Sequence, residues 1–147
     1  MRARDLAGEF PTVEPTTSAL EAARLLADQD LPGLIVLDES GRPSQILPGT
    51  QVLRFAVPQY AQEDPALARV IDESHADLFL RALDGKTVRE VLPETPRELP
   101  VVEADATVLE VAALMARVRS PVVAVVADGR MTGAITLDSL LDRLLAT

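Results

Sequence analysis

The chain has 147 residues, with 23 acidic side chains against 14 lysines and arginines, and a formal charge of −9. This charge repels a phosphate backbone, and an aromatic content of only 3% leaves few stacking platforms, so nucleic-acid binding is disfavoured. Cysteine is absent and His75 is the single histidine, which excludes disulfides, thiolate metal sites and a histidine-based triad within one chain.

The length fits one domain, or two small modules that share a core. The longest unbroken apolar run, 122–127, is far shorter than the roughly 20 residues that a membrane span needs. The N-terminal segment MRARDLAGEF has no apolar core of the kind found in signal peptides. The sequence therefore predicts a soluble, cytoplasmic chain with no direct membrane insertion.

The first half of the chain predicts five elements in order. These are an extended start at 12–13, a helix, a buried strand at 33–37, a strand at 44–47 and a second helix, and a turn at 38–42 joins the two strands. The apolar positions of the first helix recur with helical spacing (Leu20, Ala23, Leu26, Ala27), and Ser18 supplies a hydroxyl for its N-cap.

A helical insertion is predicted over 58–86. Asp64 and Pro65 are typical of a helix start. The apolar face of this helix would end near Asp84-Gly85 and comprise Leu67, Val70, Ile71, Leu78 and Ala82. Because His75 falls on that face, we interpret it as a packed core residue and not as a ligand.

The second half repeats the first. Residues 102–142 align with 13–54 across one gap, with identities such as Leu20/Leu109, Pro32/Pro121 and Gly41/Gly129. The copy has an extended start at 100–102, strands at 122–126 and 132–135, and a helix capped by Thr107 whose apolar face holds Val108, Val111, Ala112 and Met115. Two β-α-β-β-α units predict an α/β (α+β) fold in which the copies cover each other. The expected domains are residues 1–57, a linker at 58–86, and residues 87–147.

The repeat resembles a tandem pair of cystathionine-β-synthase (CBS) domains, the Bateman module. The resemblance is carried by LIVLD (34–38), VAVVA (123–127), the ending GAITLDS (133–139), and short leading helices at 3–6 and 88–92. It implies two repeats packed with pseudo-twofold symmetry, which act as a non-catalytic sensor. It also implies a homodimer, a regulated enzyme or transporter as partner, and a ligand such as AMP, ADP, ATP or S-adenosylmethionine. No cofactor is required.

The GAITLDS ending carries the main candidate binding residues. Thr136 stands where a strand stops and a helix starts, and the N–H groups of such a first turn favour phosphate or ribose oxygens. Ser139 takes the position where the family prefers a ribose-binding aspartate, while Asp138 lies one residue early and is expected to point elsewhere. In the first copy Pro48 and Gln51 occupy these positions, so that half is expected to be degenerate.

The resemblance also implies ligand contacts from two other segments. Arg119, Ser120, Pro121 and Val122 would line the adenine, with Arg119 within reach of a phosphate. Pro100 and Val101 would flank the base, while Asp30, the first-copy counterpart of Arg119, would repel a phosphate.

Three alternatives to a nucleotide sensor stay open. The first is a ligand-free dimerisation or protein-interaction module, favoured by Pro48, Gln51 and Ser139. The second is a divalent-cation sensor built from the acidic excess, although the carboxylates concerned are scattered along the chain (Glu9, Glu14, Asp28, Asp30, Asp38, Glu39). The third, an enzyme, is the weakest, because no nucleophile, base and orienting group stand together. The ligand, the regulated partner and the orientation of the dimer are not predicted.

Overall fold

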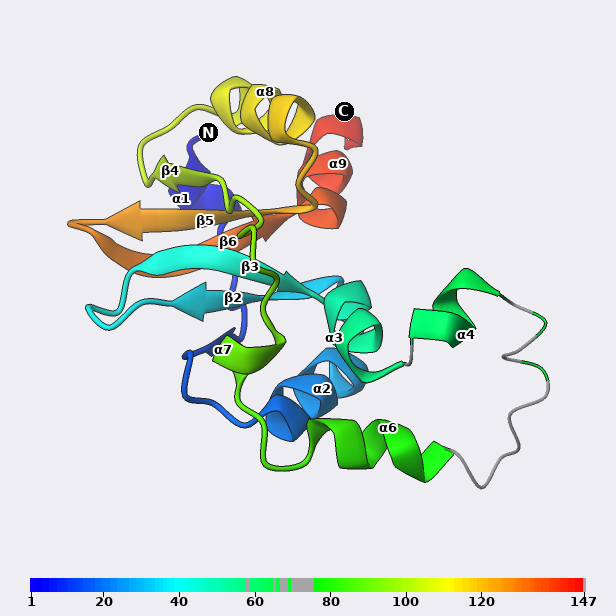
Figure 1. Ribbon diagram of the computed structural model, residues 1–147. Helices are drawn as coiled ribbons and strands as arrows, with labels where there is room; N and C mark the ends of the chain where they lie inside the picture. Colours follow the sequence, from blue (N-terminus) through cyan, green and yellow to red (C-terminus); the bar gives the residue numbers. More distant parts are fainter. Residues whose placement is uncertain (58, 65, 67–68, 70–75, 147) are drawn as a thin grey trace. The chain divides into compact units, whose positions relative to one another are not determined.

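The chain runs twice through the same order of elements, which confirms the predicted pair of β-α-β-β-α repeats (Figure 1). The computed structural model describes residues 1–57, 59–64, 66, 69 and 76–146. The first repeat comprises α1 (Ala3–Leu6), β1 (Thr12–Val13), α2 (Ala19–Asp28), β2 (Gly33–Leu37), β3 (Pro43–Pro48) and α3 (Gly49–Ala56). The second comprises α7 (Val88–Val91), β4 (Val101–Glu103), α8 (Val108–Val118), β5 (Val122–Ala127), β6 (Arg130–Thr136) and α9 (Leu137–Leu145).

The segment between the repeats contains α4 (Gln59–Glu63) and α6 (Ala76–Leu83). The predicted helix of this segment is confirmed at its C-terminal end, where α6 stops one residue before Asp84. The other residues of that prediction, namely Pro65, Leu67, Val70, Ile71 and His75, lie outside the described residues.

Each repeat contributes a three-stranded sheet, with strand orders β1-β2-β3 and β4-β5-β6. In the second sheet β4 runs parallel to β5, and β5 and β6 form an antiparallel hairpin. Asp128 and Gly129 close that hairpin with φ values of 54° and 80°. Positive φ at both central residues matches the twist of the flanking strands, which explains the Asp-Gly pair at this turn.

The predicted helix caps are confirmed in both repeats. The Ser18 hydroxyl accepts a hydrogen bond from the Glu21 N–H at 3.4 Å, and the Thr107 hydroxyl accepts one from the Glu110 N–H at 3.1 Å. Each hydroxyl satisfies an N–H group that has no partner inside its own helix, so the two helices begin at the same position of the repeat.

The two main helices bury different faces. In α8 the predicted face is confirmed, with Val111 and Met115 buried. In α2 the fully buried residues are Ala19 and Ala22, whereas most of the predicted stripe is half-buried and Ala27 is exposed. The reason is that α2 contacts three other helices, α3, α6 and α7, and alanine lets their backbones approach closely.

The chain divides into two compact units that do not coincide with the repeats. Unit 1 comprises residues 1–12, 35–46 and 97–147, and unit 2 comprises residues 13–34 and 47–96. Helix α1, which leads into the first repeat, therefore belongs with β4, β5 and β6 of the second, as the blue helix beside β4 in Figure 1 shows. Its backbone is bonded there, from Ala3 N–H to the Ala106 carbonyl at 2.7 Å and from Arg4 N–H to the Ala104 carbonyl at 2.9 Å.

Unit 1 has two hydrophobic clusters. In the first, Ala3 and Ile135 pack with residues of α8, β5 and α9, namely Ala106, Val111, Met115, Val123, Val125 and Leu140. In the second, Ile35 and Ile46 of the first repeat pack against Val122, Ala124 and Ala134 of the second, together with Leu99. The expectation that strands of the two copies cover each other is met in this second cluster.

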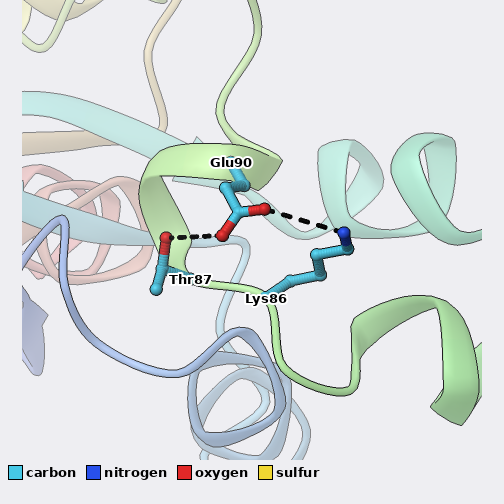
Figure 2. Close-up of polar contacts among 3 residues, drawn as sticks. All are labelled: Lys86, Thr87 and Glu90. Carbon is cyan, nitrogen blue, oxygen red and sulfur yellow. Dashed lines mark hydrogen bonds and ion pairs between the residues drawn. The ribbon is translucent and has the colours of Figure 1, made fainter.

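Unit 2 is a helical body in which α7, the leading helix of the second repeat, packs with α2 and α3 of the first. The Val88 N–H donates to the Thr17 carbonyl at 2.8 Å, and the Ala19 N–H donates to the Lys86 carbonyl at 2.9 Å. Beside this junction, Glu90 accepts a hydrogen bond from the Thr87 hydroxyl at 3.4 Å and pairs with the Lys86 ammonium at 3.7 Å (Figure 2). The ion pair is about half exposed, so it contributes at most about 1 kcal/mol.

Candidate functional site

The candidate residues of the second repeat meet at one end of its sheet. Strands β4 and β5 are parallel, and β6 is antiparallel to β5. The first residues of β4 and β5 and the last residues of β6 therefore lie at the same end of the sheet. Pro100 precedes β4, Val122 opens β5, and Thr136 closes β6 directly opposite Val122. Pro100 and Val122 are buried, while the side chain of Val101 is 40% exposed.

Thr136 caps α9. Its hydroxyl accepts a hydrogen bond from the Ser139 N–H at 3.2 Å and lies 2.8 Å from the Ser139 hydroxyl. The Leu137 N–H donates to the Pro121 carbonyl at 2.9 Å. Two N–H groups of the first turn of α9 therefore already have partners in the chain, which corrects the expectation that these groups are exposed to a ligand. Asp138 is exposed on the same turn, where a carboxylate interacts favourably with the helix dipole.

The segment 119–122 turns sharply between α8 and β5. Arg119 ends α8 in the left-handed conformation, with φ 59° and ψ 38°, and its N–H donates to the Met115 carbonyl at 2.8 Å. The Ser120 hydroxyl donates to the Val122 carbonyl at 2.7 Å and accepts from the Val122 N–H at 3.3 Å. Because Pro121 is also bonded to α9, the backbone joins this segment to the Thr136 junction.

Two hollows of about 420 Å³ each lie in unit 1, a volume typical of small-molecule sites. The first, named here the arginine hollow, is lined by Arg97, Glu98, Arg117, Val118, Arg119 and Ser120. The second is lined by Asp5, Leu6, Ser139, Asp142, Arg143 and Ala146. The candidate residues are thus divided, with Arg119 and Ser120 in one hollow and Ser139 in the other.

The corresponding junction of the first repeat has no hydroxyl at the positions of Thr136 and Ser139. Pro48 stands at the N-cap of α3 and makes no side-chain cap bond, while the Gly49 N–H donates to the Pro32 carbonyl at 3.0 Å, as Leu137 does to Pro121. The side-chain amide of Gln51 donates to the Val91 carbonyl at the end of α7, at 2.8 Å. The position that the family uses for a ribose-binding aspartate thus holds a structural amide here.

Arg97, Glu98, Arg117 and Val118 line the arginine hollow but were not singled out from the sequence. A signal for them exists only in retrospect, because Arg97 lies in the segment that leads into β4, Arg117 in the last turn of α8 and Arg119 at the C-cap of α8. No spacing rule links residue 97 to residue 117, and their proximity depends on the parallel pairing of the two strands.

Two kinds of feature are absent from the residues that the structure describes, namely a metal site and a membrane span. In this part of the chain no three His, Asp or Glu side chains gather closely enough to hold a metal ion. None of its helices combines the length and the apolar character that crossing a membrane requires.

Comparisons with known proteins identify one family. The family model for the CBS domain matches residues 3–57 and 88–146. The crystal structure of a CBS domain-containing protein of unknown function from Kribbella flavida is similar, with 54% identity, a TM-score of 0.92 and 99% of each chain covered. A search of curated proteins found no match.

Two more distant structures share the fold. The CBS domain of a membrane protein from Sphaerobacter thermophilus has 23% identity and a TM-score of 0.73, with 100% of this chain and 90% of that chain covered. The structure of CBSX2 in complex with AMP has 21% identity and a TM-score of 0.68, with 99% of this chain and 96% of that chain covered.

Proposed function

Because this chain belongs to the CBS domain family, with two repeats in tandem, we propose that it is a regulatory module that binds an adenine nucleotide on its second repeat. The ligand would lie at the sheet end where Pro100, Val122 and Thr136 meet, and its binding would modulate a partner enzyme or transporter. AMP bound to CBSX2, a protein of the same fold, supports an adenine nucleotide as the ligand class. The proposal includes a non-catalytic role and a cytoplasmic location.

The observation that carries the proposal is the bond from the Leu137 N–H to the Pro121 carbonyl, at 2.9 Å. It joins the segment expected to line the adenine, 119–122, in which Arg119 is within reach of a phosphate, to the segment expected to hold the sugar, 136–139. With Val122 paired to Thr136 as well, both segments lie at the same end of one sheet. In the first repeat Pro48 and Gln51 supply no comparable hydroxyls, so the proposal assigns one nucleotide per chain.

Thermal unfolding with AMP, ADP, ATP and S-adenosylmethionine tests the proposal. A ligand present at about 100 times its Kd stabilises the native state by about 2.7 kcal/mol, which raises Tm by roughly 5–10 °C in a chain of this size. Thr136→Ala removes a helix cap and lowers stability by about 1 kcal/mol by itself, so the quantity to compare is the rise caused by the ligand.

Thr107→Ala is the matched control, because it removes the equivalent cap from α8. We expect Thr107→Ala to keep the ligand-induced rise and Thr136→Ala to lose most of it. If no adenosine compound raises Tm in the wild-type protein, adenine-nucleotide binding is wrong. If both variants keep the full rise, a nucleotide binds but Thr136 takes no part.

Exposed leucines favour a second candidate, a homodimeric interaction module that needs no ligand. Leu53 on α3 and Leu141 on α9 occupy equivalent positions of the two repeats and are 52% and 42% exposed. On α9, Leu137, Leu141 and Leu144 are all exposed and recur at helical spacing, which makes an apolar stripe along this helix. We expect analytical ultracentrifugation to show a dimer for the wild-type protein and a monomer for Leu53→Gln/Leu141→Gln. A monomeric wild-type protein at high concentration would exclude this candidate.

A further inference from the structure

The arginine hollow concentrates positive charge in an acidic protein. Arg97, Arg117 and Arg119 line it together with one acidic residue, Glu98, which gives a formal charge of +2 in a chain of −9. All four side chains are exposed enough to meet a solute from solvent. The charge of the hollow is therefore opposite in sign to that of the chain around it.

Within the described residues, none of the three guanidinium groups forms an ion pair. Among the residues that the structure describes, the only ion pair is Lys86–Glu90, so none of the three has a carboxylate within 4.0 Å there. Three like charges around one hollow repel each other, and an anion with several oxygens relieves that repulsion. Guanidinium groups bind phosphate oxygens in a planar, bidentate manner, which favours phosphate over a simple halide.

The backbone also holds one of these arginines in a costly conformation. Arg119 has φ 59°, a region that glycine adopts freely and that other residues adopt at a cost of about 1–2 kcal/mol. The first-repeat counterpart, Asp30, has φ 51°, so this backbone shape belongs to the repeat, and in the second repeat it places an arginine at the rim of the hollow.

We propose that the arginine hollow binds a phosphoanhydride group, so that the nucleotide carries at least two phosphates. This rests on the adenine-nucleotide function proposed above, and it narrows the ligand class to ADP or ATP in preference to AMP or S-adenosylmethionine. The hollow and the Thr136 junction lie at the same end of the sheet, joined through Ser120 and Pro121. A diphosphate carries more negative charge and more oxygens than one phosphate, so it suits three guanidinium groups spread around the hollow better.

Isothermal titration with inorganic pyrophosphate, AMP, ADP and ATP tests the proposal on the wild-type protein and on Arg97→Gln/Arg117→Gln. Arg119 is left unchanged, because replacing it also alters the backbone. Arg130→Gln is the control, since Arg130 opens β6 at the opposite end of the same sheet. We expect wild-type protein to bind ADP and ATP at least about tenfold more tightly than AMP, and to bind pyrophosphate in competition with ADP. The double variant should lose that tenfold preference and the pyrophosphate binding, and the control should keep both.

The outcomes separate the two proposals. Equal affinity for AMP, ADP and ATP in wild-type protein, or an ADP preference that survives in the double variant, overturns the phosphoanhydride site while leaving adenine-nucleotide binding intact. Pyrophosphate binding that the double variant loses, with no gain in affinity from the adenosine part of ADP, supports the anion site and rejects the adenine-nucleotide function. If Arg130→Gln also loses the preference for ADP and ATP over AMP and the binding of pyrophosphate, the assignment to this hollow is overturned. The effect is then one of overall charge.

Discussion

The N-terminal segment covers the free edge of β6 so closely that one added methyl group should lower the stability of the protein. Gly8 and Ala134 exchange two backbone hydrogen bonds, each of 3.0 Å. A Cβ atom at Gly133 would lie 2.8 Å from the Gly8 carbonyl oxygen and 3.2 Å from the Ala7 Cβ. Because the first of these atoms belongs to the backbone, Gly133→Ala forces the segment around Gly8 away from β6.

Gly133→Ala should lower the free energy of unfolding by about 1 kcal/mol. Overpacking of this kind costs typically 1–3 kcal/mol, and the loss of chain entropy in the unfolded state returns about 0.4–1 kcal/mol. The matching change, Gly8→Ala, meets no atom within 4 Å, and Gly8 has no positive φ. We therefore expect Gly8→Ala to be neutral or slightly stabilising.

Urea unfolding of the two variants measures this difference, with hydrogen exchange as a local readout. In Gly133→Ala the amides of Gly8 and Ala134, which bond to each other's carbonyls, should exchange faster than in the wild-type protein. Equal stability of the two variants, or unchanged protection of Ala134, would refute the packing of the N-terminal segment on β6.

Three further results are expected. Arg119→Gly should raise stability by about 1 kcal/mol in urea unfolding, because it relieves the positive φ of that residue; a loss would show that the arginine side chain stabilises the free protein. Asp38→Ala should destabilise at neutral pH, because the Arg42 and Ser40 N–H groups bond the Asp38 carboxylate and hold its pKa below the ordinary value. This contribution is present above the ordinary pKa, about 3.9, and is lost as the pH falls through the lowered value, so the two proteins should converge in acid melts. Ala3→Asp should cost about 3 kcal/mol or more and reduce hydrogen-exchange protection in β4 and β5, because Ala3 is fully buried against the second repeat; a loss confined to the first repeat would contradict this.

The elements with local signals were predictable from the sequence. Ser18 and Thr107 cap their helices as expected, and the continuous apolar runs become β2 and β5, because both features depend on residues only a few positions apart. The repeat strengthened these predictions, since each weak local pattern occurs twice in register. The proposed order of elements followed from these signals alone.

Features that depend on distant partners were not predictable. The periodicity of α2 could not reveal that this helix contacts three others. It therefore predicted an apolar face with Leu20 and Leu26, whereas the buried residues are Ala19 and Ala22. Residues 3–6 read as a short helix, but nothing in them says which repeat they will join. In the candidate site the hydroxyl at Thr136 was found from its motif, whereas Arg97 was not, because it comes into position only through strand pairing.

The leading helix of each repeat packs with the other repeat, and for α1 this has a consequence during synthesis of the chain. Arg2 and Asp105 are in contact across 103 residues, so α1 leaves the ribosome long before its partners in the second repeat exist. At about 5–20 residues per second, this helix waits roughly 5–20 s. Until then Ala3 has no core to enter, and a four-residue helix is too short to persist alone in water. Helix α1 is therefore made well before it can form, and unit 1 can close only after the second repeat has been translated through α9.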